Sequence, residues 1–140
     1  MAGTATPIFP QTIKTYAAQL LTADGTTKKT LVTAGANGSR VDAINAASTD
    51  TTARDLQLWI TQGGTDYLLG TVQLPINAGN TNASPSVDVL RSAQIPGLAY
   101  DANGNRVIYL GSGAVLKVAV LAAVTAAKEL DVIATTAGDY

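Results

Sequence analysis

Histidine and cysteine, which carry much of enzyme and metal chemistry, do not occur among the 140 residues of this chain. Without histidine there is no ordinary general base or imidazole metal ligand, and without cysteine there is no thiolate site and no disulfide. The sequence also lacks a G-x-S-x-G elbow, a P-loop and a G-x-G-x-x-G turn. We therefore expect a protein that is not an enzyme, with no catalytic residues, no metal and no cofactor.

One stretch has the beginning of a calcium-binding loop, with oxygen-bearing side chains at alternate positions: Asp101, Asn103 and Asn105. That motif needs glycine at the next position, where Arg106 stands, and glutamate at its twelfth, where Ser112 stands. Both departures argue against calcium binding. The stretch instead predicts a type I′ hairpin turn centred on Asn103-Gly104.

The other polar candidates have simple structural interpretations. Asn37-Gly38-Ser39 matches a glycosylation acceptor, but no export signal accompanies it, and a turn that fixes strand register is favoured. Asp42 and Asp55 stand next to Arg40 and Arg54, so solvated or ion-paired strand edges are expected rather than an acid–base pair.

The charge balance limits the partners. The formal net charge is −1, and charged residues make up 14% of the chain, against about 25% in a typical soluble protein. No basic stripe exists for nucleic acid, and the longest apolar stretch, residues 118–124, is too short to cross a membrane. We expect a protein made in a cytoplasm. A protein surface with so few charges is typical of a subunit that contacts neighbours in an assembly. An ordinary monomeric β-sandwich covered by small Ala and Thr side chains would have the same composition.

The elements that position these residues are short strands separated by turn signals. Strands are expected at residues 13–21, 30–33, 40–47, 55–61, 66–74, 87–90, 106–110, 115–121 and 130–136, and loops at residues 75–86 and 122–128. The pattern predicts an all-β fold: one β-sandwich domain over residues 13–140, jelly-roll-like, preceded by an extended N-terminal arm over residues 1–12.

Side-chain alternation assigns faces to two of these strands. Leu56, Leu58 and Ile60 share one face, which puts Trp59 on the other. In residues 66–74, Leu68 and Val72 are expected together on one face. Broken alternation after Val41 predicts a β-bulge near Asp42-Ala43.

Four residues are candidates for an interface. Pro7 and Pro10 stiffen the arm around Ile8 and Phe9, the latter the only phenylalanine, so these apolar side chains could reach a neighbour; a frayed terminus is the alternative. Trp59 is either an exposed interface anchor or packed on an inner strand, and the sequence does not decide between the two. The interface candidates are Ile8, Phe9, Pro10 and Trp59.

The stretch from Leu31 to Leu69 carries a family resemblance. Its matching pieces are Thr33-Ala34-Gly35, Gly38-Ser39-Arg40-Val41-Asp42, Thr51-Thr52-Ala53 and Leu56-Gln57-Leu58-Trp59-Ile60, and the ending, Val132-Ile133-Ala134 with Gly138-Asp139-Tyr140, matches as well. These pieces resemble a group of small virion structural proteins of tailed bacteriophages, and the resemblance covers about two thirds of the chain. The ending departs from the group's pattern at Thr136-Ala137, where that pattern has glycine.

The resemblance implies a capsid decoration (cement) protein. Such a protein would sit on the head surface of the virion, bind the major capsid protein and stabilise the shell, and we expect a homo-oligomer with a trimer favoured. A neck or tail accessory role, or a receptor- or carbohydrate-binding module of the virion, is the alternative.

Overall fold

Alternating apolar residues give most strands one buried face. In β4, Leu56 and Leu58 are fully buried while their neighbours are partly exposed. The computed structural model describes residues 9–140, except for the side chains of residues 135–137. Its elements are β1 (Thr12–Leu21), a 3-10 turn η1 (Thr22–Asp24), β2 (Lys29–Thr33), β3 (Ser39–Ser48), β4 (Arg54–Gln62), β5 (Thr65–Leu74), β6 (Val87–Asp88), β7 (Ala99–Tyr100), β8 (Arg106–Leu110), β9 (Val115–Val120) and β10 (Glu129–Asp139).

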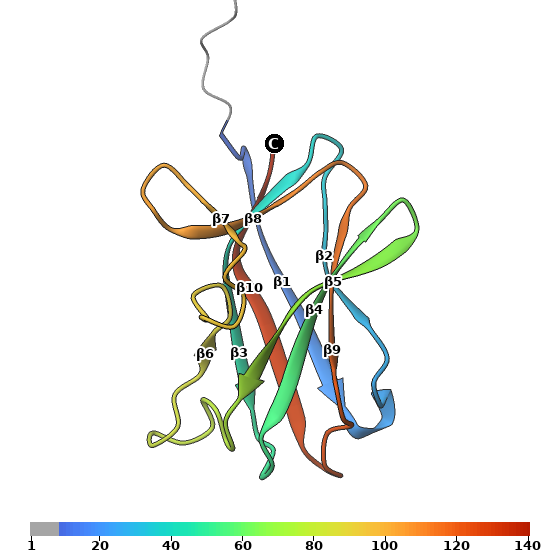
Figure 1. Ribbon diagram of the computed structural model, residues 1–140, viewed down its shortest axis with the longest axis vertical. Coiled ribbons are helices and arrows are strands. Elements are labelled where there is room, and N and C mark those ends of the chain that lie inside the picture. The colour runs from blue at the N-terminus through green and yellow to red at the C-terminus, as the bar shows by residue number, and fades with distance from the viewer. Residues whose placement is uncertain (1–8) are drawn as a thin grey trace, which may run out of the picture.

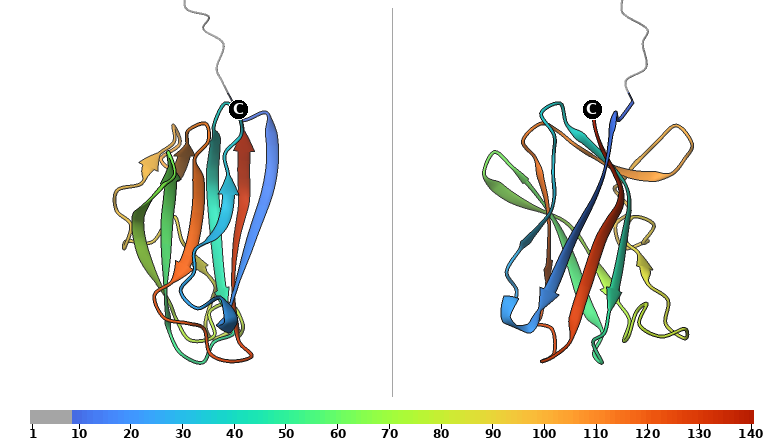
Figure 2. Two further views of the ribbon diagram at one scale, coloured as in Figure 1. Left: turned by 90° about the vertical axis from the view of Figure 1, so that its right-hand side faces the viewer. Right: turned by 180° about the vertical axis from the view of Figure 1, so that it is seen from behind.

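The strands form two antiparallel sheets that pack face to face (Figures 1 and 2). One sheet has the order β1-β10-β3-β8-β7, with the short β6 also paired to β3. The other has the order β2-β9-β4-β5. The expected all-β class and the two-sheet sandwich are confirmed.

The long strands pass from one sheet to the other at nearly every connection. Only the β4–β5 hairpin joins two long consecutive strands within one sheet. The order β1-β10-β3-β8 in one layer, opposite β2-β9-β4-β5 in the other, is compatible with the winding of two Greek keys that a jelly-roll-like fold requires. The short β6 and β7 lie within the long connection from β5 to β8.

The core between the sheets is aliphatic. The largest fully buried side chains are Leu20, Ile44, Leu56, Leu58, Leu74, Leu90, Leu116, Leu130, Val32, Val41, Val72 and Val89. Ile95, from the β6–β7 connection, closes one side of the sandwich against Gly70 of β5, where an added Cβ would lie only 3.0 Å from its Cγ1. That connection therefore contributes to the core.

Two bulges change which face a side chain occupies. In the β3–β10 ladder Val41 pairs with Ala137 and Ala43 with Thr136, so Asp42 is the extra residue and the predicted bulge is confirmed. A second bulge, at Leu69 of β5, was not predicted. It puts Leu68 opposite Trp59 on the outer face, so the expectation that Leu68 shares the buried face of Val72 was wrong.

Three local predictions need correction. The Asp101–Asn105 turn is not type I′: Gly104 has φ +80° but Asn103 does not have positive φ, and Gly104 N–H donates to Asp101 O (3.1 Å). A type I turn followed by a left-handed glycine fits these bonds. The strand expected at residues 87–90 is limited to Val87–Asp88, and β7 was not foreseen.

Candidate functional site

Both ends of the described chain lie side by side at one end of the sandwich (Figure 1). Gln11 N–H donates to Asp139 O (2.7 Å), and β1 begins one residue later, where Thr12 pairs with Asp139. Pro10 packs on Gly138, where an added Cβ would lie 2.6 Å from the proline Cβ. Residues 10–11 thus lie against β10. We call this the terminal end of the sandwich.

Two large apolar side chains are exposed at this point. Phe9 is 66% exposed and Ile13, on the outer strand β1, is 82% exposed. Ile8 lies outside the described residues. Sequence reasoning assigned Ile13 to a strand but missed its exposure, because only the sheet order shows that β1 is an edge strand.

Further exposed apolar side chains lie in the same half of the molecule. They are Tyr67 and Leu68 at the start of β5, Tyr100 in β7, and Tyr109 near the end of β8. The β4–β5 and β7–β8 turns lie in this half in Figure 1. The opposite end carries the other three in the described chain, Leu21, Ile76 and Leu121. Exposed apolar surface is therefore concentrated in the half that contains the termini.

The Asp139 carboxylate connects β10 to β1 and β3 at the terminal end. Lys14 Nζ lies 2.5 Å from its Oδ2, the Ser39 hydroxyl donates to its Oδ1, and Gly35 N–H donates to Ser39 Oγ (2.9 Å). Gly35 faces the carboxyl so closely that an added Cβ would lie 2.7 Å from Asp139 Cγ. The Lys14 ammonium and the Ser39 hydroxyl hold the pKa of Asp139 below its usual range.

Trp59 is on the outer face of the four-stranded sheet, as predicted, but it does not project freely. The Lys28 ammonium lies 3.8 Å from the centre of the indole ring and 3.0 Å from Asp66 Oδ2. Lys117, the cross-strand neighbour of Trp59, also reaches Asp66 (3.1 Å). The Thr61 hydroxyl and the two lysines lower the pKa of Asp66. Trp59 is thus half-buried under a cation.

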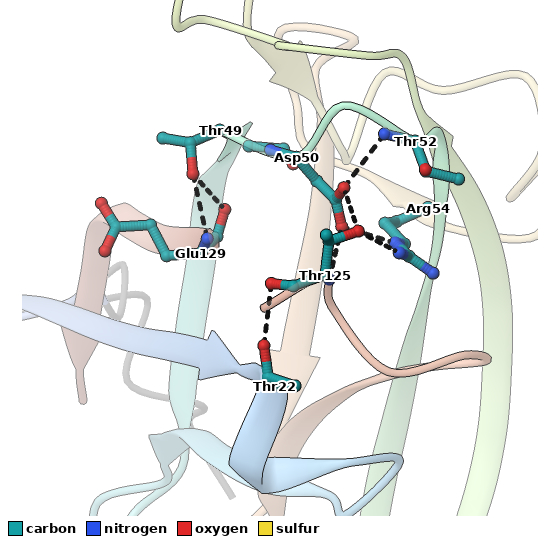
Figure 3. Close-up of polar contacts among 8 residues, drawn as sticks. Thr22, Thr49, Asp50, Thr52, Arg54, Thr125 and Glu129 are labelled. Atoms are coloured by element: carbon teal, nitrogen blue, oxygen red, sulfur yellow. Dashed lines mark hydrogen bonds and ion pairs between the residues drawn. The ribbon is translucent and has the colours of Figure 1, made fainter. Parts of the chain in front are cut away.

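The opposite end of the sandwich contains a buried ion pair (Figure 3). The Asp50 side chain is 0% exposed and accepts from Arg54 Nε (2.7 Å), Thr125 N–H (3.0 Å), Thr125 Oγ1 (2.7 Å) and Thr52 N–H (3.0 Å). Thr125 O in turn accepts from the Thr22 hydroxyl (2.8 Å). The expected pairing at the strand edge therefore holds for Arg40 with Asp42, whereas Arg54 pairs with Asp50 instead of Asp55.

These contacts make Asp50 a structural group. Burial opposes its ionisation, but the donors from Thr125, Arg54 and Thr52 outweigh burial and hold its pKa well below the usual range. With all its acceptor positions engaged, the carboxylate has none left for a substrate. It joins the β3–β4 loop to the β9–β10 loop.

The depressed carboxyl pKa values predict how stability depends on pH. A carboxyl with a lowered folded pKa stabilises the fold above its unfolded pKa, near 3.8, and this contribution is lost as pH falls through the folded value. The chain has no histidine to titrate near neutrality. The melting temperature should be nearly constant from about pH 5 to 7.5 and fall below about pH 4. Differential scanning calorimetry across this range measures it, and a step between pH 6 and 7 would contradict the assignment.

Two features are absent from the described residues, 9–140. No three acidic side chains there lie close enough together to hold a metal ion. No helix in that part of the chain is long and apolar enough to cross a membrane.

Comparison with known proteins does not extend these observations. No family model, no curated protein and no solved structure matches the chain.

Proposed function

We propose that this protein is a virion structural protein of a tailed bacteriophage that decorates the head, where it binds the major capsid protein and stabilises the shell. It would act as a homo-oligomer, in our proposal a trimer at local threefold points of the shell. The head surface of the virion is then its location. The family resemblance of the sequence motivates this proposal.

The exposed apolar side chains in the half of the molecule that contains the termini support the structural side of the proposal. Phe9 and Ile13, four residues apart at the beginning of β1, are both exposed, and Lys14 pairs with Asp139 beside them. A surface of this kind suits attachment to another protein. A two-sheet sandwich, with a strand order compatible with a jelly roll, is an architecture used in viral capsids and in lectins, which is an argument from analogy only.

The expected mechanism of stabilisation is additive burial. Each apolar side chain of the terminal segment would contribute roughly 1.5–3 kcal/mol at best when it becomes buried on a neighbour. Several copies joined in one oligomer would bind together, so modest contacts could add up to firm attachment. Low charge on the rest of the chain limits repulsion between neighbouring copies.

A cryo-EM map of the parent particle tests the proposal directly. Density for the sandwich on the outside of the head, at the threefold points, is the expected result. Density at the neck or tail would overturn the head assignment in favour of an accessory or receptor-binding role. A particle that lacks the protein would overturn the virion assignment altogether.

Deleting residues 2–11 should weaken attachment to the shell while the sandwich stays folded. The deletion ends before β1; of the described residues it removes 9–11, and with them the backbone bond from Gln11 to Asp139 and the contact of Pro10 with Gly138. We expect an unchanged circular dichroism spectrum, a smaller oligomer by light scattering, and weaker binding to the shell. Phe9→Ala should reproduce part of that loss, because the side chain is exposed and contributes little to the fold.

The matched control is Leu121→Ala. Leu121 is also a large exposed apolar residue but lies at the opposite end, after β9, so its removal should leave the oligomer and attachment unchanged. If the deleted protein occupies particles as fully as the intact chain, the terminal segment is not the attachment element. Trp59 would then be the next residue to test.

A further inference from the structure

A polar hollow lies on the outer side of the larger sheet, lined by residues of β3, β6, the β7–β8 hairpin and the segment after β6. Its volume is about 320 Å³, and its lining includes the side chains of Leu90 and Val107 from the protein interior. Around these lie three guanidinium groups and three carboxylates, from Arg40, Arg91, Arg106, Asp42, Asp88 and Asp101. The wall of the hollow is polar and formally neutral, and Leu90 and Val107 lie almost fully buried beneath it.

Two of the three arginines of this wall are already paired with carboxylates, and the third is bonded to main-chain oxygens. Arg40 Nε lies 2.7 Å from Asp42 Oδ1, and Arg91 Nε lies 3.5 Å from Asp88 Oδ2. Arg106 Nη1 donates to the main-chain oxygen of Ser92 (2.6 Å). A charged ligand bound at Arg40 or Asp42 would have to break their half-buried pair, which is costly, whereas the exposed Asp88–Arg91 pair is weak. The hollow therefore disfavours ions and favours a neutral, polar ligand.

Hydrogen-bonding capacity nevertheless remains on these side chains. Asp101 Oδ1 accepts from the main-chain N–H groups of Asn103 (2.9 Å) and Asn105 (2.8 Å), whereas its Oδ2 accepts no bond from any described residue. Arg40 Nη1 likewise has no acceptor among the described residues. A hydroxyl group both donates and accepts, so neighbouring hydroxyls could use a carboxylate oxygen and a guanidinium N–H together.

An aromatic ring stands next to the hollow. Tyr109 is the cross-strand partner of Arg40 in the β3–β8 ladder and follows Val107 by two residues, which puts it on the same face of β8. It is 50% exposed. An exposed ring of this kind offers a flat apolar surface with a polar tip, to which the C–H face of a sugar ring can pack.

We propose that the polar hollow, together with Tyr109, binds a neutral saccharide residue. The hydroxyls bond to Asp101, Arg40 and the Asp88–Arg91 pair, and the apolar side of the sugar rests on Tyr109. The proposal does not depend on the place of the protein in the virion, because a head protein and a tail protein could each carry such a site.

Saturation-transfer difference NMR on the full chain tests this site. The probes are D-glucose, D-galactose, D-mannose, N-acetyl-D-glucosamine and L-rhamnose, each at about 20 mM, a concentration suited to millimolar affinity. We expect transfer to at least one sugar. Tyr109→Ala should weaken its binding about fivefold or more, and Asp88→Ala combined with Arg91→Ala should weaken it as well.

The matched control is Tyr67→Ala, which removes an equally exposed tyrosine, 58% against 50%, from the other sheet. It should leave sugar binding unchanged. The variant residues are exposed, and circular dichroism checks that each protein is folded. Three results would overturn the proposal: no transfer to any of the five sugars, transfer that Tyr109→Ala leaves unchanged, or binding of sulfate or acetate at this hollow in place of sugar.

Discussion

Replacing Asp50 with alanine is expected to lower the free energy of unfolding by about 3–5 kcal/mol, because it leaves a charged partner buried without its counter-ion. The Arg54 side chain is only 12% exposed, and Asp50 is its sole carboxylate partner among the described residues. The substitution also removes the acceptor for the N–H groups of Thr52 and Thr125. Urea denaturation measures this decrease in the free energy of unfolding, and the dependence of that free energy on urea concentration should stay unchanged.

Two further variants, Asp88→Ala and Asp50→Asn, serve as comparisons for Asp50→Ala. Asp88→Ala removes an exposed carboxylate whose partner, Arg91, is 3.5 Å away and 72% exposed, so it should cost no more than about 1 kcal/mol. Asp50→Asn should fall between the two, because the amide keeps one acceptor oxygen but turns a donor toward the donors of Thr125 and Arg54. Equal losses for Asp50→Ala and Asp88→Ala would show that the network does not hold the two loops together.

The strands could be predicted from the sequence because their signals are local. Alternation marks the faces of β4, and Gly63-Gly64 and Asn103-Gly104 mark hairpins without any knowledge of the rest of the fold. The bulge at Asp42 was visible for the same reason, since an extra residue interrupts the alternation of its own strand. The bulge at Leu69 was not, because Tyr67, Leu68 and Leu69 are all apolar and show no interrupted pattern.

The polar contacts could not be predicted because they join distant parts of the chain. Thr125 lies 75 residues from Asp50, and Asp139 lies 100 residues from Ser39. Each of these residues stands in a segment that, alone, is a polar loop or a strand end. The polar hollow is a similar case, since it appears only when β3 and β8 become neighbours and bring Arg40 beside Tyr109.

Gly38→Ala is expected to have the second large effect, a loss of about 3 kcal/mol of stability, from strain of the backbone and a clash with it. Gly38 has φ +92°, which residues with a Cβ seldom adopt. An added Cβ would lie 2.7 Å from Leu110 O, a main-chain atom held in the β3–β8 ladder, where Leu110 pairs with Ser39. Neither the added Cβ nor Leu110 O can move away without disturbing the β3–β8 ladder.

Gly104→Ala isolates the part of this loss that comes from the clash. Gly104 also has positive φ, +80°, but an added Cβ there meets nothing within 4 Å, so only the conformational cost of about 1 kcal/mol remains. Because Tyr140 N–H donates to Gly38 O (3.2 Å), the clash should also loosen the end of β10. Faster amide exchange at Tyr140 in Gly38→Ala, but not in Gly104→Ala, would show this. If Gly38→Ala and Gly104→Ala lost equal stability, the loop around Gly38 would have to shift to accommodate the added methyl group. The terminal end would then be less rigid than its contacts indicate.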